Sequence, residues 1–196
     1  MAVTTLDPRT ALVLIDLQHG IVGSPGLAPN TGADVVKRAV RLADAFRGHD
    51  LPVVLVRVTA AAADGADAVR GRIDGPSRAR TFPEGWDVIV DDLTGHPEDL
   101  SVTKRNWGAF YGTDLDLHLR RRGITQIVLA GIATSIGVES SARAAHEHGY
   151  HVTLATDAMS DLDHETHRNS VERIFPRLGE TGTTEEIVEL LDKTRV

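Results

Sequence analysis

Short, near-continuous apolar runs that alternate with helical patterns are the feature that most constrains the fold of this chain. The runs lie at residues 11–16, 52–59, 101–104, 126–131 and 151–156. They have the length of strands, and the clearest of them contain β-branched residues, which favour strands. Strands that are apolar along their whole length are buried on both faces, as in parallel sheets covered by helices. The runs therefore predict a parallel sheet at the centre of the molecule.

Helices are predicted between most of these strands and after the last one, because apolar residues recur there at helical spacing. The predicted helices lie at residues 33–49, 113–122, 137–148, 165–175 and 184–192. Thr113 is a plausible cap for the second helix, and Gly123 and Gly149 follow two of the helices, where glycine commonly ends a helix. The pattern predicts a three-layer, doubly wound α/β fold of the Rossmann-like kind, with a mostly parallel sheet of about six strands.

One long segment, residues 60–86, interrupts this alternation. It is rich in Ala, Gly, Asp and Arg and contains Pro76 and Pro83. We interpret it as an excursion over the carboxyl edge of the sheet, and loops of this length are often functional or disordered. The sequence shows neither repeats nor a second domain, so we expect residues 1–196 to form a single domain.

Composition narrows the classes of partner. The net charge of −7, without a basic stripe, argues against nucleic acid or an anionic membrane as the partner. The start of the chain has no signal-peptide pattern, and the apolar residues 11–15 are too few to span a bilayer, so we expect a cytoplasmic protein. The chain contains no cysteine, which excludes disulfides, thiolate metal sites and thiol catalysis.

Charged residues end the first and the third predicted strands, and ligands of parallel α/β sheets bind beyond the carboxyl ends of the strands. Asp16 ends the first strand, where burial would raise its pKa and make it a candidate acid or base; alternatively, it only caps the following turn. Lys104 ends the third strand, where it could pair with Asp16 or polarise a substrate oxygen; alternatively, it is a solvated loop lysine.

Aromatic residues are scarce in this chain, yet Trp107, Phe110 and Tyr111 lie close together after the third strand. They could form the wall of a pocket, or equally part of the core or an interface. Residues 131–137 follow the fourth strand as a short turn into a helix, which can present backbone N–H groups to a carboxylate or an oxyanion. Gly137 in this turn leaves room for a ligand or water, unless it serves only close packing.

Other polar residues give weaker indications of chemistry. Asp157 ends the fifth predicted strand, and we favour a structural role for it. His164 and His167 are three residues apart on one helix and could bind a metal ion, but no third ligand is evident, so we predict neither a metal site nor a cofactor. Ser135 is the only hydroxyl at a plausible nucleophile position, and the sequence places no histidine to activate it.

Taken together, the three strand ends resemble the isochorismatase-like (cysteine hydrolase) family over essentially the whole chain. The matching stretches are DLQ at 16–18, KRNWGAFYGTDLD at 104–116 and AGIATSIGVESSARAAHEHGYHVTLATDA at 130–158, with TTEEI near the end. The resemblance implies a hydrolase of a small molecule, commonly a homodimer or higher homo-oligomer, with a cis peptide bond expected at 132–133. It also implies a catalytic set and a substrate-binding set. These are Asp16, Lys104 and Gly137 (at the position of the family Cys), and Gln18, Trp107, Phe110, Ala133, Thr134 and Ser135.

The main departure from the family pattern is Gly137, because amidase-type relatives attack a carbonyl through a thiolate at that position. Isochorismatases proper also carry glycine there. In that branch the aspartate acts as a general acid on a vinyl ether, and the products are pyruvate and an alcohol. Shortly after the second strand, isochorismatases usually carry a glutamine and nicotinamidases carry a metal-binding cluster. In this chain residues 60–63 of that region are all alanine. The sequence thus leaves three hypotheses open: a thiol-independent hydrolase, a retired member that binds ligands or partners, and hydrolysis through Ser135 or a water activated by Asp16.

Overall fold

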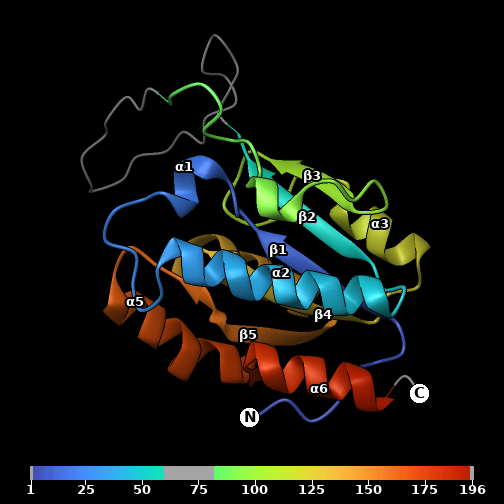
Figure 1. Cartoon of the computed structure of the whole chain (residues 1–196). Coiled ribbons are helices and arrows are strands. Elements are labelled where there is room, and N and C mark those ends of the chain that lie inside the picture. The colour runs from blue at the N-terminus through green and yellow to red at the C-terminus, as the bar shows by residue number, and fades with distance from the viewer. Residues whose placement is uncertain (1, 60–81, 195–196) are drawn as a thin grey trace.

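The structure, a computed structural model, describes residues 2–59 and 82–194. Within them the strands are β1 (Thr10–Ile15), β2 (Val53–Val58), β3 (Leu100–Lys104), β4 (Gln126–Ile132), β5 (His151–Ser160) and β6 (Glu180–Gly182). They form one sheet in the order β3-β2-β1-β4-β5-β6, and every neighbouring pair is parallel (Figure 1). The predicted α/β fold is therefore confirmed. Most of the predicted excursion at 60–86 lies outside the described residues.

Helices cover both faces of the sheet. They are α1 (His19–Val22), α2 (Gly32–Gly48), α3 (Leu115–Arg121), α4 (Glu139–Glu147), α5 (His164–Asn169) and α6 (Thr184–Thr194). On the face seen in Figure 1, α2 lies beside α6, while α3 and α4 pack on the opposite face. No helix in the described parts of the chain is long and apolar enough to cross a membrane.

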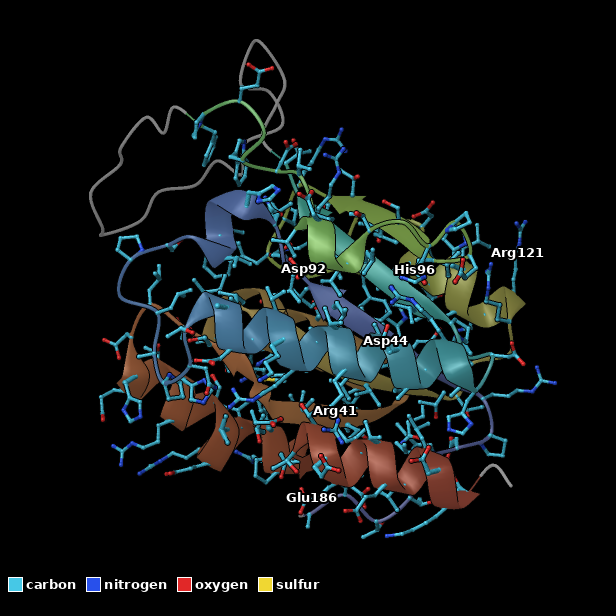
Figure 2. The ribbon with its side chains drawn as sticks, in the orientation of Figure 1. Arg41, Asp44, Asp92, His96, Arg121 and Glu186 are labelled. Carbon is cyan, nitrogen blue, oxygen red and sulfur yellow. The ribbon has the colours of Figure 1, made fainter. Side chains whose placement is uncertain are left out.

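Alternation along the central strand divides the core into two halves. Ala11, Val13 and Ile15 of β1 face the cluster built with α3 and α4, whereas Leu12 and Leu14 face the cluster built with α2 and α6. All five side chains are buried, which explains why the run is apolar at every position. Charged residues remain on the outer side of the helices, such as Arg41 and Asp44 on α2 (Figure 2).

The end of β5 differs from the expectation. The strand continues to Ser160 rather than ending at residue 156, because its pairing with β4 shifts register. Leu129 pairs with Leu154, but Gly131 pairs with Met159, so β5 bulges between these two points. Asp157 therefore lies within β5, where its Oδ1 accepts hydrogen bonds from the backbone N–H and the hydroxyl of Thr184 at the start of α6. Its predicted structural role agrees with these contacts.

Two predicted helices also differ from the structure: one α-helix begins later than expected, and the other is divided into shorter turns. The helix expected at 137–148 is preceded by a wide π-helical turn, Thr134–Val138, and α4 itself begins at Glu139. The helix expected at 165–175 is divided into α5, a second π-helical turn Ser170–Ile174 and a 3-10 turn Phe175–Arg177. Apolar spacing does not distinguish a π turn from an α turn, because the two differ by only about one residue per turn.

Candidate functional site

An ion pair joins two of the strand ends that sequence analysis singled out. Asp16 follows β1 directly, with a positive φ of 55° that turns the chain away from the sheet. Lys104 is the last residue of β3 and reaches past the end of β2, so that its Nζ lies 2.7 Å from Asp16 Oδ2. The side chains are only 2% (Lys104) and 6% (Asp16) exposed, so Lys104 is not a solvated loop lysine.

The Lys104 ammonium uses all of its hydrogen-bonding capacity within the protein. Besides Asp16, its Nζ donates to the backbone carbonyls of Asn106 at 3.2 Å and Trp107 at 2.7 Å. A lysine ammonium has three N–H groups, so this set of acceptors saturates it. Lys104 therefore holds Asp16 in place, and in this arrangement it has no N–H left to polarise a substrate oxygen.

The two oxygens of Asp16 have different surroundings. Oδ2 accepts the hydrogen bond from Lys104, whereas Oδ1 is buried and has no hydrogen-bond partner among the residues that the structure describes. Burial raises the pKa of Asp16 to about 6, and the opposing attraction of Lys104 offsets this only in part. A carboxyl group with this pKa can hold a proton near neutral pH, and Oδ1 is the oxygen with an unused position for it.

Gly137 lies against this ion pair. A Cβ atom at residue 137 would lie 3.1 Å from Asp16 Oδ2 and 3.6 Å from Lys104 Nζ, and 3.0 Å from Cγ2 of Ile15. A side chain at this position would therefore point at the Asp16 carboxyl and crowd it. The three predicted catalytic positions, which are 88 and 33 residues apart along the chain, come together at the carboxyl edge of the sheet.

The turn that carries Gly137 begins after a cis peptide bond between Ile132 and Ala133, as the resemblance implied. The Thr134 hydroxyl is buried and lies within hydrogen-bonding distance of the Ser160 carbonyl (3.0 Å) and of Nδ1 of His167 (2.9 Å). The His167 imidazole thus pairs with buried Thr134 rather than with Ser135. In the described structure His167 is therefore not placed to activate the Ser135 hydroxyl.

Burial lowers the pKa of His167, which favours its neutral form. In the described residues, no group of three or more His, Asp or Glu side chains is arranged to hold a metal ion.

Two residues of the implied substrate-binding set, Gln18 and Phe110, contact other parts of the protein. The Gln18 amide is buried and donates to the carbonyls of Val58 and Trp86, while its Oε1 accepts from the Val58 N–H. The Phe110 ring lies in the core against His148, with centroids 5.2 Å apart. In this arrangement the contacts of Gln18 and Phe110 are therefore with the protein itself.

The three aromatic residues after β3 have different surroundings. The side chains of Trp107 and Tyr111 are 64% and 77% exposed, whereas Phe110 is buried. Trp107 contributes its backbone carbonyl to the site, as an acceptor for Lys104. The three aromatic residues are neighbours in sequence but do not form one surface.

Sequence analysis missed Asp161, the residue that follows β5. Its Oδ2 accepts a 2.6 Å hydrogen bond from the backbone N–H of Ser135, at the start of the Gly137 turn. The sequence offered the stretch LATDAMSD, but Asp157 was taken as the strand end because the bulge in β5 is not visible in the pattern of apolar residues.

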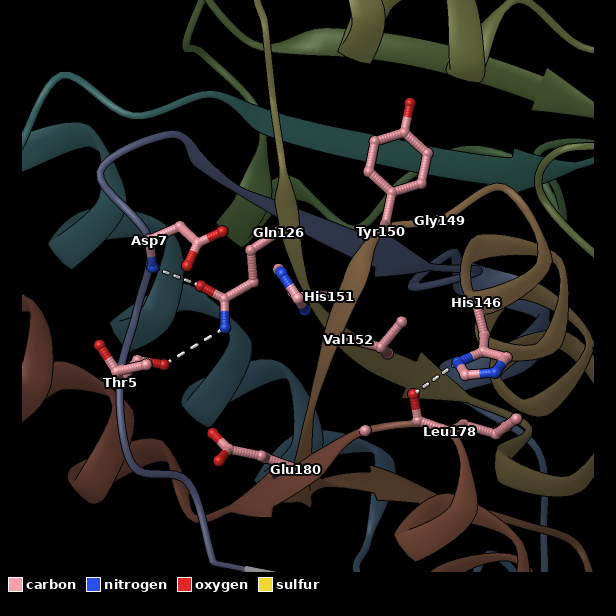
Figure 3. A pocket seen from close by; sticks show the side chains of 11 residues that line it. Thr5, Asp7, Gln126, His146, Gly149, Tyr150, His151, Val152, Leu178 and Glu180 are labelled. Atoms are coloured by element: carbon pink, nitrogen blue, oxygen red, sulfur yellow. Dashed lines mark hydrogen bonds between the residues drawn. The ribbon is translucent and has the colours of Figure 1, made fainter.

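The described surface also has two hollows away from this site. One, of about 480 Å³, lies where β4, β5 and β6 begin and is lined by residues such as Gln126, His151 and Glu180 (Figure 3). The other, of about 560 Å³, lies between α1, α2 and the 3-10 turn Asp91–Leu93. Neither is lined by Asp16 or Lys104, so the chemistry of the strand ends is separate from both.

A parallel α/β sheet with a buried carboxyl–ammonium pair at its carboxyl edge defines the class of site. Comparisons with known proteins then identify the family. Residues 10–186 match the family model of the isochorismatase domain. The chain is 49% identical over 182 residues to the uncharacterized isochorismatase family protein YecD of Escherichia coli O157:H7, covering 93% of this chain and 96% of YecD. The chain belongs to the isochorismatase family of hydrolases.

Two further relatives show the range of the likeness. A solved isochorismatase family protein from Burkholderia thailandensis has a TM-score of 0.91 and 45% identity to this chain, covering 96% of this chain and 98% of that one. Ureidoacrylate amidohydrolase RutB of Methylobacterium radiotolerans is 30% identical over 196 residues, covering 86% of this chain and 72% of RutB.

Proposed function

We propose that this chain is a thiol-independent hydrolase in which Asp16 acts as a general acid on the vinyl ether of a small molecule, such as isochorismate. The observation that carries the proposal is the asymmetry of the Asp16 carboxyl. Its Oδ2 is held by Lys104, while its Oδ1 is buried with no partner in the described part of the chain, and the group has a pKa of about 6. The chain has no cysteine, so the thiolate route of amidase-type relatives is closed.

The reaction begins with a proton on Asp16 Oδ1. The vinyl π electrons take this proton at the terminal carbon, which forms a C–H bond and leaves an oxocarbenium ion on the substrate. Water adds to the cationic carbon and its proton returns to Asp16, giving a hemiketal. The hemiketal then breaks its C–O bond to the alcohol, with a proton moved from the hydroxyl to the leaving oxygen, and yields a ketone such as pyruvate. The net change is addition of one water.

Of the two roles considered for Lys104, its contacts favour pairing with Asp16 over polarising a substrate oxygen. Because its N–H groups bind Asp16 and two carbonyls, we propose that it stabilises the Asp16 carboxylate that forms when the proton leaves, rather than binding a carboxylate of the substrate. This interaction strengthens as charge develops on Asp16, and it requires no movement of the ammonium.

The direct test is to incubate the purified protein with isochorismate and a panel of other enolpyruvyl ethers and to follow pyruvate release. We expect turnover by the wild type and a loss of at least about 100-fold in Asp16→Asn, since general acid catalysis contributes roughly 10²–10⁴-fold. Asp157→Asn is the matched control, because Asp157 contacts α6 and not the site. Absence of turnover on the whole panel would refute the proposal.

A second function is favoured by the geometry of Gly137. The Cβ position of Gly137 points at Asp16 and Lys104, as a nucleophile at this position would. The name of RutB also gives an amide-cleaving activity for a relative. The alternative is therefore a retired thiol enzyme that binds ligands without turnover. Gly137→Cys, screened with amides and esters, tests it: activity in that variant alone supports the retired enzyme, and wild-type turnover of a vinyl ether excludes it.

A further inference from the structure

The turn from Thr134 to Val138 determines how closely Gly137 approaches the Asp16 carboxyl, so whatever holds this turn also acts on the site. The first residues of the turn contact the segment that follows β5 rather than their own helix. Ser135 donates its backbone N–H to Asp161 Oδ2 at 2.6 Å, and the Thr134 hydroxyl lies 3.0 Å from the Ser160 carbonyl.

Hydrogen bonds fix both the backbone and the side chain of Asp161. Its backbone N–H and carbonyl pair with the carbonyl and N–H of Ala28, at 2.9 and 2.8 Å. Its second carboxylate oxygen, Oδ1, accepts the N–H of Leu162 at 2.8 Å. The residue is only 3% exposed. A buried carboxylate with both oxygens engaged and with its backbone fixed has a single position, so the N–H of Ser135 is held at a fixed place.

The far end of the same turn is also anchored. The Gly137 carbonyl accepts a 2.7 Å hydrogen bond from the Ser141 hydroxyl, which in turn accepts the N–H of Ala109. The turn is thus tied at its start to the segment after β5 and at its end to the segment after β3. Gly137 lies between these two anchors, at the point that faces Asp16 Oδ2.

We infer that Asp161 is a positioning residue of the site: by holding the Ser135 N–H it keeps the Gly137 turn packed over the Asp16–Lys104 pair and water away from the Asp16 carboxyl. The inference rests on the proposed function only in taking Asp16 as the acid. When Asp161 no longer holds the Gly137 turn, we expect water to reach the Asp16 carboxyl. Contact with water lowers the pKa of Asp16 toward the ordinary range of aspartates.

The test is a titration of the Asp16 carboxyl by ¹³C NMR in the full chain, with the Asp16 signal assigned by its loss in Asp16→Asn. Asp161→Ala removes the acceptor for both Ser135 and Leu162. Asp161→Asn keeps the size and one oxygen, and serves if the alanine variant does not fold. We expect the pKa of Asp16 to fall by about one unit or more in Asp161→Ala and by less in Asp161→Asn.

Asp157→Ala is the matched control for stability. Asp157 lies on β5, four residues before Asp161, and also accepts backbone and hydroxyl hydrogen bonds, but from Thr184 at the start of α6 and not from the turn. We expect this variant to lose stability with the pKa of Asp16 unchanged. An unchanged pKa of Asp16 in the folded Asp161 variants, or an equal fall in Asp157→Ala, would overturn the inference.

The titration uses no substrate, so its outcome is independent of the turnover test. A fall in the pKa of Asp16 in the Asp161 variants supports the positioning role even if no vinyl ether is hydrolysed. Conversely, turnover of a vinyl ether by the wild type, with the pKa of Asp16 insensitive to Asp161, would support the function and contradict the positioning role.

Discussion

Asp16 is a buried carboxyl whose charged form is disfavoured in the folded chain. Its pKa rises from 3.8 to about 6, so the folded state binds its proton more tightly than the unfolded state does. Its contribution to stability is therefore greatest below the unfolded pKa and is lost as the pH rises through about 6. The difference corresponds to about 3 kcal/mol at pH 7, by the relation of roughly 1.4 kcal/mol for each pKa unit.

Asp16→Asn should for this reason remove the pH dependence that Asp16 gives to the stability of the protein. The amide is neutral at all pH values and still offers an oxygen to Lys104, but it also leaves the buried Lys104 ammonium without a negative partner, which lowers the stability of the variant at every pH. Relative to the wild type, we expect the free energy of unfolding of the variant to increase by about 2 kcal/mol between pH 4 and pH 7, which urea unfolding at the two pH values measures. The same difference between variant and wild type at both pH values would contradict the account of Asp16.

Lys104→Met probes the other half of the pair. It removes the attraction that holds the pKa of Asp16 down while leaving the carboxyl buried, so we expect the pKa of Asp16 to rise above its value in the wild type. A ¹³C titration measures the change, and Lys193→Met, on an exposed helix position, is the control. A pKa of Asp16 that does not rise would mean that Lys104 does not stabilise the carboxylate.

At the scale of elements, a buried ion pair ties α2 to the segment that precedes β3. Arg47 near the end of α2 donates to Asp99, with Nη2–Oδ2 at 2.6 Å and side chains that are 10% and 5% exposed. Removing one partner leaves the other charge buried, which typically costs about 3–5 kcal/mol.

We expect Arg47→Met to lower the free energy of unfolding by roughly this amount, because the lost contact with exposed Asp44 adds little to it. Thermal and urea unfolding measure the loss, and Arg41→Met, whose partner Glu185 is on the exposed side of α6, should cost less than about 1 kcal/mol. Equal losses in the two variants would show that burial of the pair is not what matters.

Elements with long apolar runs were predictable from the sequence, and those without such runs were not. The runs of β1 and β4 are buried along their whole length, whereas β2 and the edge strand β3 are buried only in part. The sixth, β6, has three residues, none of them a large hydrophobic side chain, and exists through its pairing with β5. The end of β5 was misplaced by four residues because a bulge leaves no trace in apolar spacing, and this is why Asp161 was missed.

The candidate site was also predictable from the sequence only in part. Asp16 and Lys104 directly follow or end apolar runs, and parallel strands bring their carboxyl ends to one edge. The contacts of Gln18 and Phe110 were not predictable, since an amide that binds backbone and a ring that turns into the core have the same sequence pattern as residues that face a ligand.

At the scale of the whole molecule, the doubly wound sheet brings together groups that the chain keeps far apart. With β1 in the middle of the order β3-β2-β1-β4, the ends of β1, β3 and β4 meet around one carboxyl group. The two halves of the core fix these strands from both faces, so the site is built on rigid elements.

The pH dependence of vinyl ether hydrolysis tests the central claim most directly. Since Asp16 must be protonated to act as the acid and has a pKa of about 6, kcat/KM for pyruvate release should be constant below that pH. Above it, kcat/KM should fall about tenfold per pH unit, and Asp16→Asn should not show this dependence. A rate that rises with pH through 6, or the same profile in Asp16→Asn, would contradict the assignment of Asp16 as the acid.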